Sequence, residues 1–246
     1  MKFFKRIYIL FIKFRLKYFE RFAKKDDFNK ILEASGFNIG KGTIFYSPNT
    51  MCIDRQRPWM LEIGKYCKIT RGTVILTHDY SRSVLRYKYK EIIGEAAKTI
   101  IGDNVFIGIN SIILMGTKIG NNVIVGAGSV VSGNIPDNVV ICGNPAKIIM
   151  TLDDFYKKKK AKEIGAAKEY FSCFVKKYGR RPKPNEVGPF FTLFAKRDMN
   201  YIKKYKIPFV FNGDDMDDVI ISFLNSKPLF SSFEEFESEM EKNEQS

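Results

Sequence analysis

His78 is the only histidine of this 246-residue chain, and it lies in the segment THDYS at residues 77–81. An imidazole with an ordinary pKa of about 6.5 can take a proton from an attacking hydroxyl near neutral pH. The ring is better fixed when a carboxylate or a carbonyl holds its second nitrogen. Asp79 is adjacent, but neighbours in an extended chain point to opposite sides, so Asp54 is an equal candidate for that partner. His78 is therefore suited to accept a proton, and the residues leave the partner of its ring open.

The sequence beyond this histidine is built from six-residue repeats. A branched aliphatic residue opens six consecutive hexads, at Ile101, Ile107, Ile113, Ile119, Val125 and Val131. This period fits neither a helix nor a single strand, and it is typical of a parallel β-helix in which three hexads complete one coil. Residues eighteen apart should then stack inside the coil. Gly or Asn should occupy the corners, where a positive φ costs these residues little.

The repeat is interrupted where the histidine lies. The same phase appears upstream at Ile63, Ile69 and Ile75, but Ile75 and Ile101 are 26 positions apart, which is not a multiple of six. A loop must therefore leave the coil between them, and His78 lies near its start. Loops that project from a rigid scaffold often carry catalytic residues.

These features resemble the hexapeptide-repeat acyltransferases, and among them the O-acetyltransferases of galactoside, maltose and polysaccharide type. The resemblance runs from about Ile39 to Ile149 and depends on the hexads, the THD loop and the run GAGSVVSGNIPDNVVICGNPAKII. It implies a mainly β fold, a left-handed parallel β-helix that assembles as a homotrimer with active sites between subunits. It also implies acetyl-CoA as co-substrate, no metal, and His78 as the general base.

The resemblance assigns further residues to coenzyme A. The backbone of Gly108 and Ile109 matches the family segment that stabilises the oxyanion, but the family's serine is Ile109 here, so only the main chain can serve. The remaining expected contacts are Gly126, Ala127, Ser132 and Gly133 for the pantetheine arm and Lys147 for the phosphates. For a saccharide acceptor, the segment IFYSPNTMCID contributes Asn49 and Asp54.

Composition narrows the class of protein. Four cysteines without CxxC spacing favour reduced thiols and a cytoplasmic location. The chain has a net charge of +14. The positive charge of residues 1–25 and the negative charge of residues 214–246 cancel, so the middle of the chain carries the excess positive charge. This suits a phosphorylated ligand. Nucleic acid is disfavoured because no recognised binding motif accompanies the charge.

Two segments flank the repeats. Residues 1–35 contain a basic amphipathic helix, read either as peripheral membrane contact through residues 1–25 or as a cap on the open coil. Its longest unbroken run of apolar residues is too short to span a bilayer. Residues 36–150 form the β-helix. Residues 151–246 should form a helix over 152–178, ended by prolines, followed by an irregular aromatic segment of unassigned role.

Other classes fit less well. The GAGSVVS segment lacks the third glycine of a dinucleotide loop, and one histidine cannot supply the three that a zinc hydratase of this fold class needs. We therefore predict an acetyl-CoA-dependent O-acetyltransferase that acts on a cell-surface polysaccharide or its precursor. The alternatives are a non-catalytic β-helix scaffold or an enzyme acting on a small soluble sugar.

Overall fold

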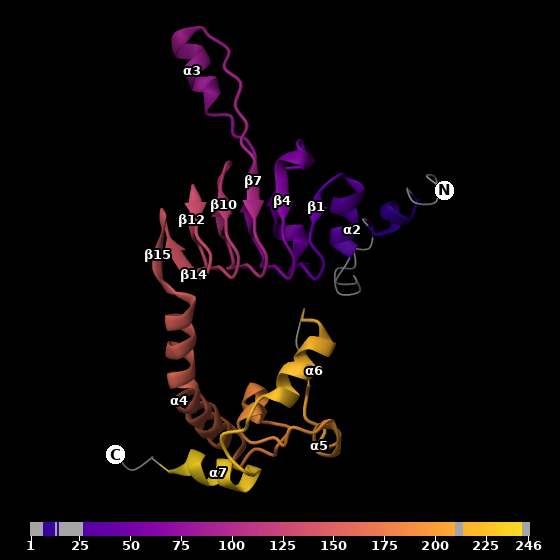
Figure 1. Cartoon of the computed structure of the whole chain (residues 1–246), viewed down its shortest axis with the longest axis vertical. Coiled ribbons are helices and arrows are strands. Elements are labelled where there is room, and N and C mark those ends of the chain that lie inside the picture. Colours follow the sequence, from indigo (N-terminus) through magenta and orange to yellow (C-terminus); the bar gives the residue numbers. More distant parts are fainter. Residues whose placement is uncertain (1–6, 13, 15–26, 210–213, 243–246) are drawn as a thin grey trace. The chain divides into compact units, whose positions relative to one another are not determined.

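The computed structural model describes residues 7–12, 14, 27–209 and 214–242 of the chain. The chain folds into two compact units, Met1–Phe155 and Tyr156–Ser246, and each is described by itself. Within the described residues, every strand lies in the first unit, and the second unit contains most of the C-terminal helical segment (Figure 1).

Three sheets form the sides of the coil in the first unit. Sheet A contains β1 (Asn38–Ile39), β4 (Leu61–Ile63), β7 (Thr99–Ile101), β10 (Lys118–Ile119) and β13 (Asn134–Ile135). Sheet B contains β2 (Ile44–Phe45), β5 (Lys68–Ile69), β8 (Phe106–Ile107), β11 (Ile124–Val125), β14 (Val139–Gly143) and β15 (Ala146–Thr151). Sheet C contains β3 (Cys52–Ile53), β6 (Val74–Ile75), β9 (Ile112–Ile113) and β12 (Val130–Val131). The chain visits A, B and C in turn and then returns to A, so each round is one coil of a parallel β-helix.

Inward-facing side chains stack in columns along this coil. Ile101 pairs with Ile119, Ile107 with Val125, and Ile113 with Val131. All six side chains are at most 2% exposed. Because each buried Ile or Val contributes about 1.5–3 kcal/mol, these columns are the main source of stability for the coil. The predicted stacking of residues eighteen apart is confirmed.

Asparagines turn the corner between sheets A and B. Asn104, Asn122 and Asn138 have φ values of 55°, 55° and 60°. Their side chains also form a ladder, in which the Asn104 amide donates to Asn122 Oδ1 and the Asn122 amide donates to Asn138 Oδ1, each at 2.9 Å. The predicted use of Asn at corners with positive φ is confirmed.

A helix covers the open first coil. In α2 (Asp27–Ala34), Phe28, Ile31 and Leu32 are buried in the same apolar cluster as the inward-facing columns. Ile12, in the short helical stretch 7–12, is buried in that cluster too, which supports the capping role. Most of the predicted basic helix lies outside the described residues, so membrane contact through residues 1–25 stays a prediction.

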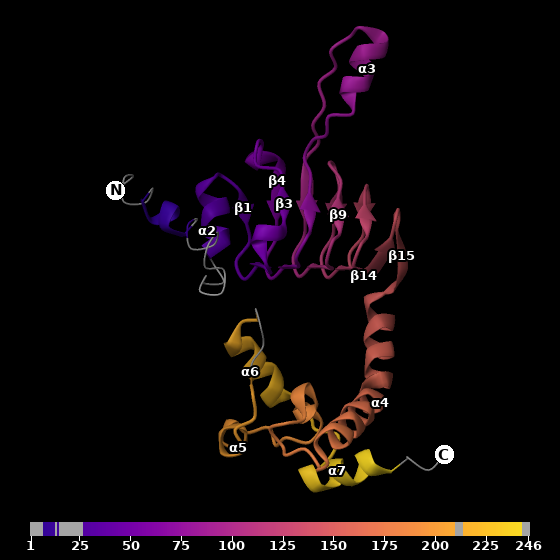
Figure 2. The same cartoon turned by 180° about the vertical axis from the view of Figure 1, so that it is seen from behind.

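The predicted loop leaves the coil between β6 and β7. We call residues 79–98 the arm; it contains the short helix α3 (Arg82–Tyr89) and extends away from the coil in both views (Figures 1 and 2). Two short 3₁₀ helices, η2 (Pro48–Thr50) and η3 (Pro58–Met60), mark smaller insertions in the first coil.

The second unit is helical, as predicted, with an aromatic core. The long helix α4 (Leu152–Tyr178) begins in the first unit, and its bounds match the prediction. It is followed by η4 (Gly188–Leu193), α5 (Met199–Lys204), α6 (Met216–Asn225) and α7 (Phe233–Glu241). The core includes Phe171, Phe191, Phe194, Phe223 and Phe236. Within the described residues, no helix is both long and apolar enough to cross a bilayer.

Shortening an inward-facing side chain should destabilise the coil. Ile107→Ala removes a fully buried side chain from the middle of sheet B and should lower the free energy of unfolding by about 2–5 kcal/mol in urea titrations. Lys118→Ala, on the outer face of sheet A, is the control and should change it by less than about 0.5 kcal/mol. Equal effects of the two substitutions would contradict the assignment of the interior columns.

Candidate active site

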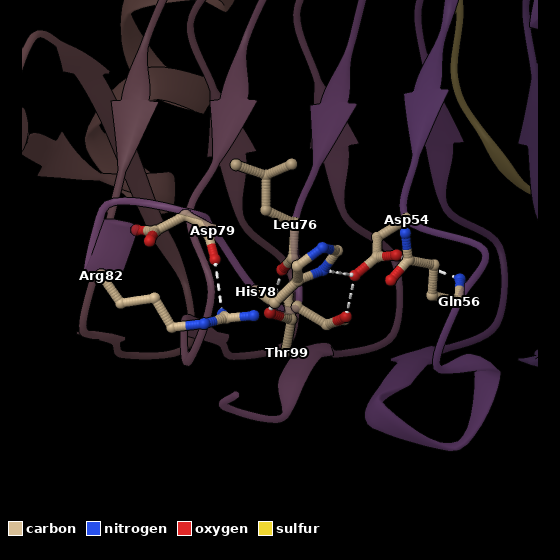
Figure 3. Close-up of polar contacts among 8 residues, drawn as sticks. Asp54, Gln56, Leu76, His78, Asp79, Arg82 and Thr99 are labelled. Atoms are coloured by element: carbon tan, nitrogen blue, oxygen red, sulfur yellow. Dashed lines mark hydrogen bonds and ion pairs between the residues drawn. The ribbon is translucent and has the colours of Figure 1, made fainter. Parts of the chain in front are cut away.

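His78 lies just after β6, at the corner where the chain leaves sheet C. We call this corner, shared by all the coils, the C–A edge, and the corner between sheets B and C the B–C edge. The His78 side chain is 22% exposed, and its Nδ1 lies 2.5 Å from Asp54 Oδ2 (Figure 3). The ring therefore has one nitrogen held by a carboxylate and reaches solvent with part of its surface.

Asp54 comes from the coil before. It directly follows β3, which pairs with β6 so that Ile53 lies beside Ile75. The Asp54 N–H donates to the Ile75 carbonyl at 3.0 Å, which fixes its backbone next to the segment that leads to His78. Residues 24 positions apart in the sequence thus meet at the same edge because their strands are neighbours.

The Asp54 carboxylate is nearly enclosed and fully hydrogen-bonded. Its side chain is 4% exposed. Oδ1 accepts from the Gln56 N–H at 3.1 Å, and Oδ2 accepts from the Thr77 hydroxyl as well as facing His78. Burial by itself raises the pKa of Asp54. The hydrogen bonds from Thr77, Gln56 and His78, with the charge of His78, outweigh burial and hold that pKa below its usual value.

An ionised carboxylate fixes the state of the histidine. Because it only accepts hydrogen bonds, the proton of a neutral His78 ring must lie on Nδ1. Nε2 then carries the lone pair that can accept a proton. The arrangement is chemically able to act as a general base.

Asp79, the other candidate partner, has a different role. Its Oδ1 accepts from the Ser81 N–H at 2.9 Å and the Ser81 hydroxyl at 2.7 Å. Its backbone carbonyl accepts from Arg82 at 3.0 Å. Figure 3 shows its carboxylate directed away from the His78 ring. The question left open by the sequence is therefore answered: Asp54 holds the ring, and Asp79 shapes the start of the arm.

The residues expected to bind coenzyme A lie on two edges of the coil. Ser132 and Gly133 follow β12 and share the C–A edge with His78. The B–C edge, on the other side of sheet C, carries the glycine pairs that follow β8 and β11, namely Gly108 with Ile109 and Gly126 with Ala127. One copy of the chain does not bring all of them together.

The main chain at the B–C edge differs in detail from the expectation. The Gly108 N–H donates to the Val125 carbonyl at 2.9 Å, and the Gly126 N–H donates to the Ile141 carbonyl at 2.8 Å. Both are therefore already used within the coil. No hydrogen bond from the N–H of Ile109 or Ala127 is seen within the described residues. The candidate N–H donors to the oxyanion are therefore those of Ile109 and Ala127, and the N–H of Gly108 is not one of them.

The side chains predicted to contact the acceptor and the coenzyme A phosphates, Asn49 and Lys147, are exposed. Asn49, in η2, lies on the B–C edge, and Lys147 lies in β15 opposite Cys142. Among the described residues, no group of three His, Cys, Asp or Glu side chains is placed to hold a metal ion. Sequence reasoning missed Thr77, whose hydroxyl contacts Asp54. The only signal was its position beside the histidine.

A β-helix of hexads with a carboxylate-held histidine at a corner has the architecture of the acyl-transferring hexapeptide proteins. Residues 98–132 match the family model described as a hexapeptide repeat of succinyl-transferase. Protein CapG of Staphylococcus aureus is 42% identical over 140 residues, which cover 57% of this chain and 78% of CapG. The chain belongs to the hexapeptide-repeat acetyltransferase family, and the left-handed β-helix expected from that membership is its fold class.

Two further proteins are similar to parts of this chain. WbbJ of Escherichia coli (strain K12), whose name describes a lipopolysaccharide biosynthesis O-acetyl transferase, is 36% identical over 125 residues. That match covers 45% of this chain and 62% of WbbJ. A maltose O-acetyltransferase structure from Clostridium difficile 630 aligns at 25% identity with a TM-score of 0.43, covering 60% of this chain and 86% of that one.

Neutralising Asp54 should give a pH-dependent loss of stability. Asp54→Asn removes a buried, charged hydrogen-bond acceptor, so we expect a loss of about 1.5–3 kcal/mol at pH 7 in urea unfolding. Because the pKa of Asp54 is lowered on folding, its carboxylate stabilises the fold above the unfolded-state pKa. That contribution is lost as pH falls below about 4, through the lower folded-state pKa.

The difference between the natural chain and this variant should therefore shrink on acidification. Asp79→Asn is the control, since its carboxylate faces solvent and, among the described residues, accepts hydrogen bonds from Ser81 alone. It should show a smaller pH dependence. A difference for Asp54→Asn that stays constant from pH 7 to pH 3 would argue against an ionised, pKa-lowered carboxylate at this position.

Proposed function

We propose that the protein is an O-acetyltransferase that moves the acetyl group of acetyl-CoA to a saccharide hydroxyl, with His78 as general base. The observation that carries the proposal is the contact of 2.5 Å between His78 Nδ1 and Asp54 Oδ2, which leaves Nε2 to accept a proton. An alcohol is a weak nucleophile at neutral pH, so taking its proton during attack lowers the barrier.

The reaction balances without another reagent. The acceptor oxygen attacks the thioester carbonyl carbon while His78 Nε2 takes the hydroxyl proton. The tetrahedral intermediate then collapses, the carbon–sulfur bond breaks, and the imidazolium returns the proton to the leaving thiolate. Asp54 stabilises the imidazolium that forms between these steps. The free N–H groups of Ile109 and Ala127 are the candidate donors for the oxyanion.

The acceptor class is inferred from a relative and from the site. WbbJ is named for lipopolysaccharide biosynthesis, which supports a cell-surface polysaccharide or its precursor as acceptor. Asn49 is exposed and remains a candidate acceptor contact. Asp54 is better suited to hold His78, because both of its oxygens already accept hydrogen bonds. Use of acetyl-CoA supports the cytoplasm as the proposed location.

A trimer explains why the site residues lie on two edges. If sheet C of each copy faces a three-fold axis, the C–A edge of one copy meets the B–C edge of the next. His78 with Ser132 and Gly133 would then face the Gly108 and Gly126 corners of a neighbour. The proposed assembly has three equivalent sites, each built from two copies.

The outer face of sheet C supports this orientation. Its outward-facing positions are Cys52, Val74, Ile112 and Val130, which are in register along the sheet. The outward-facing positions of sheet A are Asn38, Glu62, Ile100, Lys118 and Asn134. An uninterrupted apolar column on the outside of a coil is a surface suited to burial against another copy.

Replacing the histidine tests the reaction. His78→Ala should lower kcat/KM for acetyl transfer by roughly 10²- to 10⁴-fold, because the base is lost. The measurement follows thiol release from acetyl-CoA with a panel of oligosaccharides, glycolipids and small sugars. Asp79→Asn is the matched control beside it and should keep most of the activity.

Each outcome separates the proposed classes. Release with polysaccharide-type acceptors that disappears in the His78 variant supports the proposal, and release only with small sugars favours a soluble acceptor. Activity that survives in the variant overturns the assignment of the base. No release with any acceptor, together with no binding of acetyl-CoA by calorimetry, favours a non-catalytic scaffold.

A charge on the outer face of sheet C should disrupt the proposed trimer. Ile112→Glu is expected to reduce the mass measured by light scattering from that of three copies to that of one, with loss of acetyl transfer. Ile100→Glu introduces the same change on the outer face of sheet A and should leave the mass unchanged. A trimer that persists in Ile112→Glu and is lost in Ile100→Glu would place the three-fold axis at sheet A.

A further inference from the structure

We propose that Thr77 is a positioning residue of the acetyl-transfer site, whose hydroxyl fixes the Asp54 carboxylate in the orientation that holds His78. The inference rests on the proposed function, since it concerns the histidine assigned there as the base. Thr77 is fully buried, and its Oγ1 donates to Asp54 Oδ2. This is the same oxygen that faces His78 Nδ1 (Figure 3).

The Thr77 hydroxyl must be the donor in its hydrogen bond with Asp54. An ionised carboxylate cannot donate, so the Thr77 proton must point to Oδ2. With the Gln56 N–H on Oδ1, donors from two different coils hold both oxygens of Asp54. Rotation about χ2 of an Asp side chain is otherwise broad and weakly restrained. The Thr77 hydroxyl therefore adds a restraint on the oxygen that matters for His78.

The backbone of Thr77 is held independently of this hydroxyl. Its carbonyl accepts from the Ala97 N–H at 3.1 Å. The preceding Leu76 donates to the Ile113 carbonyl at 3.0 Å, and its own carbonyl accepts from the Thr99 hydroxyl at 2.7 Å. The contacts of Thr77 with Ala97 and of Leu76 with Thr99 join the segments on which the arm begins and ends. Removing the Thr77 hydroxyl should thus free the Asp54 carboxylate while the segment carrying His78 keeps its path.

The consequence should appear in the chemical step. Without Thr77 the carboxylate keeps the Gln56 contact on Oδ1, but Oδ2 has His78 as its remaining side-chain partner. The ring then spends less time with its proton on Nδ1 and its Nε2 directed outward. The Asp54 side chain is nearly enclosed and Oδ2 contacts Thr77 and His78, so we expect acetyl-CoA not to contact this oxygen. On that basis kcat should fall while KM for acetyl-CoA stays the same.

The test compares Thr77→Val with Thr77→Ser in the full-length protein. Valine has nearly the same shape without the hydroxyl, and we expect kcat to fall roughly 10-fold, as for the loss of one hydrogen bond to a charged group. Serine keeps the hydroxyl and should restore most of kcat. Thr73→Val is the matched control, because Thr73 is equally buried and its hydroxyl donates to the Thr70 carbonyl, not to Asp54.

A double variant tests whether Thr77 acts through Asp54. If it does, adding Thr77→Val to Asp54→Asn should cause no further loss of kcat. Additive losses, or a Thr77→Val variant with unchanged kcat, would overturn the proposal. If Thr77→Val folds poorly, Thr77→Ala, which removes the same hydroxyl, replaces it in the single and the double variant, and the same two outcomes decide.

A spectroscopic measurement separates this inference from the proposed function. Because the chain has one histidine, all ¹⁵N imidazole signals belong to His78. Their couplings to the ring protons distinguish Nδ1 from Nε2, so the signals report which nitrogen carries the proton. At alkaline pH we expect the Nδ1–H form in the natural chain and in Thr77→Ser, and a mixture in Thr77→Val. An unchanged Nδ1–H signal in Thr77→Val refutes the positioning role even if acetyl transfer is never detected. Loss of turnover in His78→Ala decides the proposed function separately.

Discussion

The stacking of each hexad on the hexad one coil away is the constraint on which the rest of this structure depends. Most strands contain only two or three residues, so a single strand is not stable by itself. Parallel pairing in register with both neighbours supplies that stability. Once the register is set, the apolar position that opens each hexad faces inward, every corner recurs at the same edge, and any added residues must leave the coil.

Both members of the histidine–carboxylate pair lie where residues have been added. Between β7–β9 and β10–β12, paired residues are eighteen positions apart, but Ile53 pairs with Ile75 and Ile75 pairs with Ile113, at larger separations. The extra residues after β3 begin with Asp54, and those after β6 include Thr77 and His78. Both insertions leave the coil at the C–A edge. Side chains from two coils therefore meet there, next to the paired strands of sheet C. The regular part of the fold thus positions a site that its own repeat does not contain.

The sequence predicted what depends on periodicity and composition. The coil, its columns, the loop after Ile75 and the helix over 152–178 follow from spacing and from proline positions, and the structure confirms them. Two details required coordinates. The choice of Asp54 over Asp79 depends on which insertion turns toward the ring, and the commitment of the Gly108 N–H to Val125 depends on strand pairing. The aromatic core of the second unit is formed by residues distant in sequence and without a repeat, so no spacing could reveal it.

A triangular coil places a further limit on chemistry. Its interior is filled by stacked Ile and Val side chains, so no pocket can form inside, and reactive groups must stand on edges or flat faces. At the C–A edge, His78 has the Asp54 carboxylate as partner. The backbone beside it is already hydrogen-bonded within the coil. The N–H groups of Ile109 and Ala127, which donate to no acceptor in the described part of the chain, lie on the other side of sheet C. Two edges of one convex prism point away from each other, whereas edges of adjacent prisms can face. In the proposed trimer, edges of adjacent copies would form the cleft that a single prism lacks. The apolar outer column of sheet C lies between the two edges that this association would bring together.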